Sequence, residues 1–135
     1  MTYEPLMPRR HDVTLEGTRL LIVEDDTLVS MMIEAFLGKL GCKVVATATS
    51  LQDGLLKART LVIDAAMLDI NLEGDTSYLV ADALEARNIP FLFASSYGVT
   101  ELPKRLIGVP VLSKPFGMQQ LAIVLRLAME NQPGP

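Results

Sequence analysis

Short runs of apolar residues alternate along the chain with segments of helical periodicity, and this alternation constrains the fold more than any other feature. The runs are too short for helices, and their continuous apolar character is expected of strands buried on both faces of a parallel sheet. The strands predicted in this way span residues 20–23, 44–48, 65–69, 91–95 and 109–112. Five strands that alternate with helical segments predict an α/β fold with one doubly wound parallel sheet.

The segments between the strands carry the spacing and the caps of helices. A first helix is predicted over residues 29–40, with Asp25 or Asp26 as its cap and Gly41 as its stop. A second begins at Ser50 in the manner of a capping box and runs to about residue 60.

The later helices are marked by prolines. A loop over residues 71–75 leads to a third helix that ends before Pro90, and residues 98–108 predict only a short or mobile helix. Pro115 suits the first turn of a last helix that runs to about Asn131.

The length of 135 residues allows one domain with a proper core. We expect residues 1–17 to be a flexible lead-in, residues 18–131 to form the domain and residues 132–135 to be a tail. No apolar stretch approaches the roughly 20 residues of a membrane helix, and no signal peptide is evident. With Cys42 as the single cysteine, these features predict a cytoplasmic protein that does not enter the membrane.

Charge and histidine content exclude several classes of function. The net charge is −4, and no basic cluster exceeds the pair Arg9-Arg10, which argues against a nucleic-acid surface. The one histidine, His11, precedes the first strand. Histidine-based zinc sites and Ser-His-Asp triads are therefore not expected.

Charged residues follow three of the predicted strands. Glu24, Asp25 and Asp26 follow the first strand, Asp69 closes the third, and Lys114 follows the fifth. Ligands of doubly wound sheets bind at the carboxyl ends of the strands, where Ser95 also lies. Carboxylates about 4 Å apart repel by roughly 4 kcal/mol per pair at an effective dielectric constant near 20, so such a cluster predicts bound Mg²⁺. A carboxylate nucleophile, a metal ion and an ammonium group are what a site needs to accept a phosphoryl group.

In this order, the strand ends resemble those of the receiver domain of two-component response regulators. The resemblance covers roughly residues 19–130 and is carried by the strings VEDD (23–26), MLD (67–69), FAS (93–95) and SKPF (113–116). The segment PFLFASSYG (90–98) resembles a motif, Phe-Ala-Thr-Gly-x-Tyr or a close variant, of a subgroup of alphaproteobacterial single-domain regulators, with serines in place of Thr-Gly. The family implies a flavodoxin-like (βα)5 fold with strand order 2-1-3-4-5.

The resemblance also implies roles for single residues. Asp69 would be the phosphoacceptor, and Lys114 and Ser95 would contact the phosphoryl group. Mg²⁺ would be bound by Asp69 together with Asp25 directly, Glu24 through water and the backbone carbonyl of Asn71.

Two positions depart from the common receiver pattern. Val111 stands where receivers commonly have an aromatic switch residue, and Glu73 replaces a proline in the loop after Asp69. Tyr97 is the alternative candidate for the aromatic role. The departures concern how the signal leaves the domain and not how phosphate is captured.

The last predicted helix is apolar on two sides. Ile123 and Leu127 fall opposite the face expected to pack on the sheet. They indicate an interface with a second copy in a homodimer or with a docking partner, or else they are apolar residues scattered on the surface. The pair Met31-Met32 is interpreted as core packing.

Three classes of function compete. The first is a stand-alone phosphoacceptor without enzymatic turnover of other substrates, served by a sensor histidine kinase and signalling to a phosphotransfer or downstream protein. The second is a phosphatase of the haloacid-dehalogenase type, which needs a second aspartate two positions after the first, where this chain has Asn71. The third is a degenerate receiver that binds partners without phosphorylation.

Overall fold

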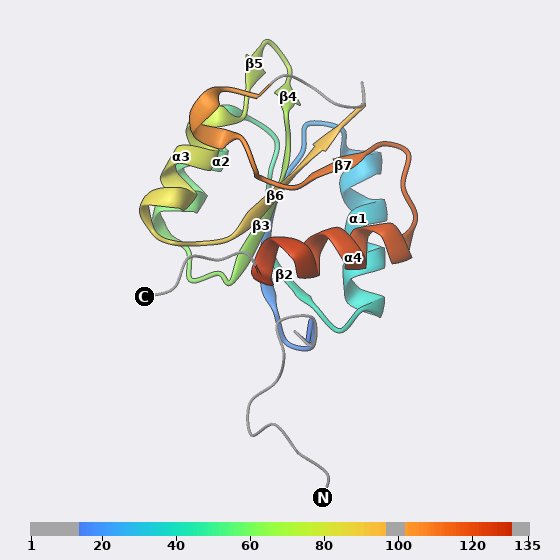
Figure 1. Ribbon diagram of the computed structural model, residues 1–135. Coiled ribbons are helices and arrows are strands. Elements are labelled where there is room, and N and C mark those ends of the chain that lie inside the picture. Colours follow the sequence, from blue (N-terminus) through green and yellow to red (C-terminus); the bar gives the residue numbers. More distant parts are fainter. Residues whose placement is uncertain (1–13, 97–101, 131–135) are drawn as a thin grey trace, which may run out of the picture.

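The computed structural model describes residues 14–96 and 102–130. Its central sheet has five parallel strands in the order β2-β1-β3-β6-β7 (Figure 1). The strands are β1 (Arg19–Val23), β2 (Lys43–Ala48), β3 (Ala65–Asp69), β6 (Phe91–Ser95) and β7 (Val111–Ser113). Counted along the chain, this is the predicted receiver order 2-1-3-4-5, so the predicted fold class is confirmed.

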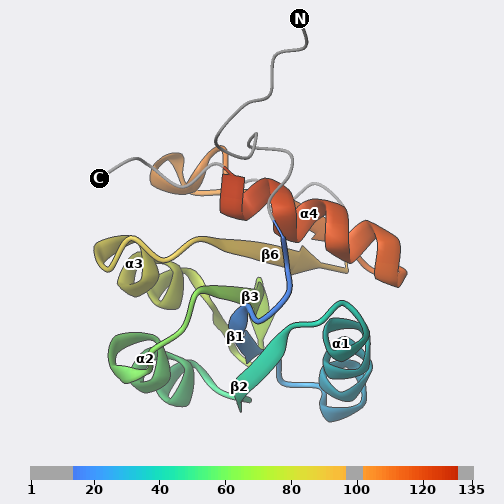
Figure 2. The ribbon, with the colours of Figure 1, turned by 90° about the horizontal axis from the view of Figure 1, so that it is seen from below.

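Two helices cover each face of the sheet (Figure 2). The helices α1 (Thr27–Lys39) and α4 (Met118–Glu130) lie on one face, and α2 (Leu51–Thr60) and α3 (Tyr78–Ala86) lie on the other. Among the described residues, no helix is long and apolar enough to cross a membrane.

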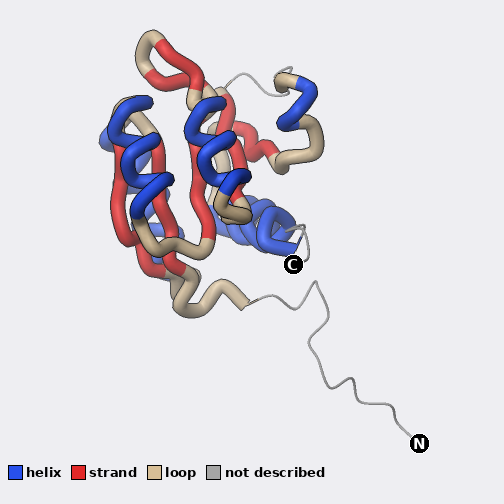
Figure 3. The backbone as a smooth tube through the Cα atoms, turned by 90° about the vertical axis from the view of Figure 1, so that its left-hand side faces the viewer, coloured by secondary structure: helices blue, strands red, loops and turns tan. Residues whose placement is uncertain are grey.

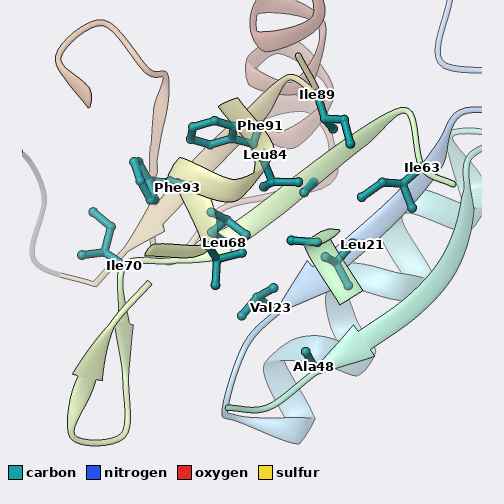
Figure 4. Close-up of a cluster of buried hydrophobic side chains, with 14 of the residues drawn as sticks. Leu21, Val23, Ala48, Ile63, Leu68, Ile70, Leu84, Ile89, Phe91 and Phe93 are labelled. Carbon is teal, nitrogen blue, oxygen red and sulfur yellow. The ribbon is translucent and has the colours of Figure 1, made fainter. Parts of the chain in front are cut away.

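Alternate residues of the central strands feed two separate cores. Leu21 and Val23 of β1 pack with Leu68 on the side of α2 and α3 (Figure 4). Leu20 and Ile22 pack on the opposite side, with α1 and α4. Because both faces are covered, β1, β3 and β6 are almost entirely apolar, as the continuous runs predicted.

The N-cap of α1 distinguishes Asp25 from Asp26. Asp26 is the N-cap of α1, and its Oδ1 accepts hydrogen bonds from the N–H groups of Leu28 (2.9 Å) and Val29 (3.3 Å). Asp25, the other predicted candidate, is therefore not needed as a cap. The predicted cap of α2 is also present, with Ser50 Oγ accepting from the N–H of Asp53 at 3.2 Å.

Two predicted boundaries were wrong. β7 begins at Val111 and not at 109, because Pro110 has no N–H to donate, although its carbonyl still accepts from Phe93 N at 2.9 Å. α4 begins at Met118 and not around Pro115. Its first turn is closed by the bond from Leu121 N to Gly117 O (3.1 Å), and Gln120 Oε1 accepts from Gly117 N at 2.9 Å.

Three other segments differ from the predictions. The loop over residues 71–75 contains a small hairpin, made of β4 (Asn71–Leu72) and β5 (Asp75–Thr76). The helix predicted over 98–108 is a 3-10 turn over Lys104–Leu106 in its described part. Met31 and Met32 are not core residues, because the buried positions of α1 are Ser30, Ile33 and Leu37.

Two glycines at the end of α1 should respond in opposite ways to alanine. Gly38 is helical, and an added Cβ would meet no atom within 4 Å, so Gly38→Ala should raise the free energy of unfolding by about 0.5 kcal/mol. Gly41 has a φ of +87°, which an alanine adopts only with strain, so Gly41→Ala should lower the free energy of unfolding by about 1 kcal/mol. Urea denaturation followed by circular dichroism measures both, and two changes of the same sign would contradict the assigned helix end.

Candidate metal centre

The pairing of β1 with β3 brings the acidic residues together. The two strands run parallel with Val23 opposite Leu68, so the residues that follow lie at the same edge of the sheet. Carboxylate oxygens of Glu24, Asp25 and Asp69 all lie within 4.8 Å of one another. The backbone N–H of Glu24 also donates to the carbonyl of Ala48 (2.9 Å), which fixes the start of the acidic segment against β2.

Lys114 reaches this cluster from the end of β7. Its Nζ donates to Glu24 Oε1 at 2.7 Å and to Asp69 Oδ2 at 3.3 Å. Its backbone N–H donates to the carbonyl of Ser95 at 2.8 Å, so the lysine is tied to the end of β6 as well. The side chain of Glu24 is only 2% exposed and that of Lys114 16% exposed, so water screens this pair weakly.

The charges of the cluster are not balanced. Burial raises the pKa of Glu24, and the neighbouring Asp69 raises it further, against the hydrogen bonds from Lys114 and the N–H of Asp26. Burial alone would lower the pKa of Lys114, but the hydrogen bond to Glu24 and the charge of Asp69 outweigh burial and raise it. One ammonium group thus faces three carboxylates.

The donor set fits a hard divalent cation. All three side chains offer oxygen, and their ligand atoms are close enough to share one ion. Burial and the neighbouring Asp69 raise the pKa of Glu24, and a bound cation would favour its charged form. The cluster could therefore bind a metal ion.

The other predicted site residues lie at varying distances from this cluster. The N–H of Asn71 donates to Asp69 Oδ1 at 3.3 Å, so Asn71 follows the cluster directly. Ser95 is buried at the end of β6, and Tyr97 lies outside the described residues. Ile123 and Leu127 of α4 are 64% and 44% exposed, so they lie on the outer side of that helix.

Sequence reasoning missed two contributors to the site. The backbone N–H of Asp26 donates to Glu24 Oε2 at 3.2 Å and so holds the buried carboxylate from its second oxygen. The hairpin of β4 and β5 starts two residues after Asp69. Strands of two residues have no periodicity, and the only signal for the hairpin was Gly74, because glycine is common in turns.

The comparisons with known proteins agree with this geometry. A model of the response regulator receiver domain family matches residues 20–126. SdrG from Sphingomonas melonis Fr1 is 42% identical, the match covers 84% of this chain and 96% of SdrG, and the TM-score is 0.74. The BeF3-activated conformation of SdrG from Pseudomonas melonis Fr1 is 41% identical over 84% of this chain and 98% of that one, with a TM-score of 0.72.

A curated relative shows the same family over part of its length. The KDP operon transcriptional regulatory protein KdpE of Escherichia coli is 31% identical over 120 residues, which are 84% of this chain and 52% of KdpE. The chain spans about half the length of the curated relatives it matches. SdrG, in contrast, is matched over nearly its whole length, which agrees with the predicted resemblance to single-domain receivers of alphaproteobacteria. By its family match, its fold and its relatives, the chain belongs to the response regulator receiver family.

Proposed function

We propose that the chain is a phosphoacceptor that takes a phosphoryl group on Asp69 from a histidine kinase and signals by protein contact. The observation that carries the proposal is the contact of Lys114 Nζ with Asp69 Oδ2 (3.3 Å) within a cluster of three carboxylates. A carboxylate that is to attack phosphorus must be ionised, and a neighbouring ammonium group favours that form.

Each neighbour of Asp69 has a role in this proposal. Asp25, Asp69 and the carbonyl of Asn71 would hold Mg²⁺, which when bound would supply positive charge to the transferring phosphoryl oxygens. Glu24 would hold the ion through water, since Lys114 Nζ and the N–H of Asp26 already bond its two oxygens.

The transfer moves one phosphoryl group between two residues. An oxygen of Asp69 forms a bond to phosphorus while the phosphorus–nitrogen bond of the donor phosphohistidine breaks. The electron pair stays on the imidazole, which takes up a proton. Lys114 then pairs with the new phosphate, and the hydroxyl of Ser95 donates a hydrogen bond to it.

The relative SdrG supports this proposal. One of its structures is of a BeF3-activated conformation. A BeF3 group on a carboxylate oxygen has the tetrahedral shape of a phosphoryl group, so an Asp69 adduct is the corresponding species expected here.

Phosphorylation of Asp69 is tested with acetyl phosphate and Mg²⁺. Intact mass should show a single phosphoryl adduct on the wild-type chain and none on Asp69→Asn or after removal of the metal. If the folded wild type stays unmodified with acetyl phosphate and with a panel of phosphorylated histidine kinases, the proposal is wrong. A partner-binding receiver that needs no phosphorylation would then be favoured.

Removal of one carboxylate should separate charge repulsion from metal binding. Without metal, Asp25→Asn should raise the free energy of unfolding by about 1 kcal/mol, because it relieves repulsion in the cluster. Saturating Mg²⁺, at about 100 times its dissociation constant, should stabilise the wild type by about 2.7 kcal/mol and the variant by much less.

The neighbouring residue supplies a matched control. Asp26→Asn removes the same charge one position later, but Asn caps helices as well as Asp does, and Asp26 is used as a cap. Thermal unfolding with and without Mg²⁺ compares the three proteins. An equal loss of the Mg²⁺ effect in both variants would contradict the assignment of Asp25 as a ligand.

A further inference from the structure

The hairpin of β4 and β5 projects from the edge of the sheet that carries the acidic cluster (Figures 1 and 3). Its strands pair antiparallel, with Asn71 opposite Thr76 and Leu72 opposite Asp75. The Glu73-Gly74 pair forms the turn, and Gly74 at its second position has a φ of +80°, a conformation that glycine adopts without strain. The hairpin thus stands beside Asp69, the proposed phosphoacceptor.

The base of the hairpin is fixed to the body of the domain. The N–H of Ser77 donates to the carbonyl of Ile70 at 2.9 Å, which closes the hairpin where it leaves the sheet. Leu72 is 3% exposed and packs in the core that also contains Ile70 and Val80. The hairpin is therefore held in one place relative to Asp69.

Its outer surface is exposed and acidic. Every hairpin residue except Leu72 is exposed, including Glu73 and Asp75. Neither of these carboxylates makes an ion pair with another residue of the described ranges. A cation in the cluster of Glu24, Asp25 and Asp69 would compensate those charges but would leave the charge of the hairpin in place.

A protein donor cannot reach Asp69 without coming close to this hairpin. Asp69 is only 8% exposed, so the phosphorus of a donor has to come right down to the edge of the sheet. A small donor such as acetyl phosphate can pass beside the hairpin, whereas a protein that carries phosphohistidine brings a wide surface with it. Positive charge on that surface, opposite to the charge of the hairpin, would speed the encounter and orient the donor.

On the basis of the proposed function, we propose that the β4–β5 hairpin, through Glu73 and Asp75, is a docking element for the phosphodonor protein, which presents basic residues beside its phosphohistidine. The hairpin then selects among protein donors and takes no part in the chemistry at Asp69.

Charge reversal on the hairpin tests this proposal. In the variant Glu73→Lys with Asp75→Lys, the initial rate of transfer from the phosphorylated histidine kinase that serves the wild type best should fall about tenfold or more at saturating Mg²⁺. The rate with acetyl phosphate should stay within about twofold, which also shows that the variant is folded. In the neutral variant Glu73→Gln with Asp75→Asn, the rate of transfer from the kinase should lie between the rates of the charge-reversed variant and the wild type. This rate should also depend less on salt than the wild-type rate does.

The matched control reverses two exposed charges elsewhere. Glu16 and Glu85 line surfaces at the opposite, amino-terminal edge of the strands, so Glu16→Lys with Glu85→Lys changes the net charge equally and should leave both rates unchanged.

Each other outcome overturns the docking role in a distinguishable way. Equal losses with both donors would place the hairpin in the chemistry of the site, and unchanged kinase transfer would exclude a docking role. A similar loss in the control would show an effect of net charge alone. A wild type that accepts phosphate from acetyl phosphate but from no kinase would end the docking proposal and leave the phosphoacceptor proposal standing. A wild type that accepts it from neither would end both.

Discussion

The pairing of β1 with β3 is the constraint on which the rest of this structure depends, because it brings three mutually repelling carboxylates to one edge of the sheet. Glu24, Asp25 and Asp69 approach within 4.8 Å because β1 and β3 are neighbouring parallel strands, and side chains alone would not gather in this way. A pair of carboxylates about 4 Å apart costs roughly 4 kcal/mol at an effective dielectric constant near 20, and the ammonium group of Lys114 offsets part of that cost here. The domain tolerates that cost because both strands are buried on both faces, where each large apolar side chain contributes about 1.5–3 kcal/mol.

The short segment after β1 divides its acidic residues among different tasks. The carboxylate of Asp26 accepts hydrogen bonds from two N–H groups at the start of α1, while the backbone N–H of Asp26 donates one to Glu24 Oε2. Glu24 is buried and pairs with Lys114. Asp25, between them, is left half-buried at the cluster. Three adjacent carboxylates therefore serve as an ion-pair partner, a candidate metal ligand and a helix cap, and their different surroundings decide which does what.

Features set by local pattern and strand order could be predicted from the sequence, and features set by tertiary contacts could not. β3 and β6 have the predicted bounds because their apolar runs are continuous, and Asp69 and Lys114 meet because parallel strands end at one edge. The hairpin was missed because two-residue strands carry no periodicity. The exposure of Met31 and Met32 was missed because an apolar residue does not reveal which side of its helix packs on the sheet. Such positions are decided by neighbours far away in the sequence.

Val111, at the position where receivers commonly have an aromatic residue, lies beside a cluster of aromatic rings. Val111 stands opposite Phe93 on β6 and packs against the core on the side of α2 and α3. Phe93 is fully buried, with its ring edge-on to Tyr78 (6.0 Å between centroids) and to Phe91 (5.7 Å). Such aromatic pairs contribute about 0.5–1.5 kcal/mol each beyond burial and hold the rings in place. A valine next to this cluster has no ring to swing between a buried and an exposed position. Among the described residues, the bonded neighbours of Asp69 are Lys114, whose backbone N–H is tied to Ser95, and Asn71 at the start of the hairpin that leads into α3.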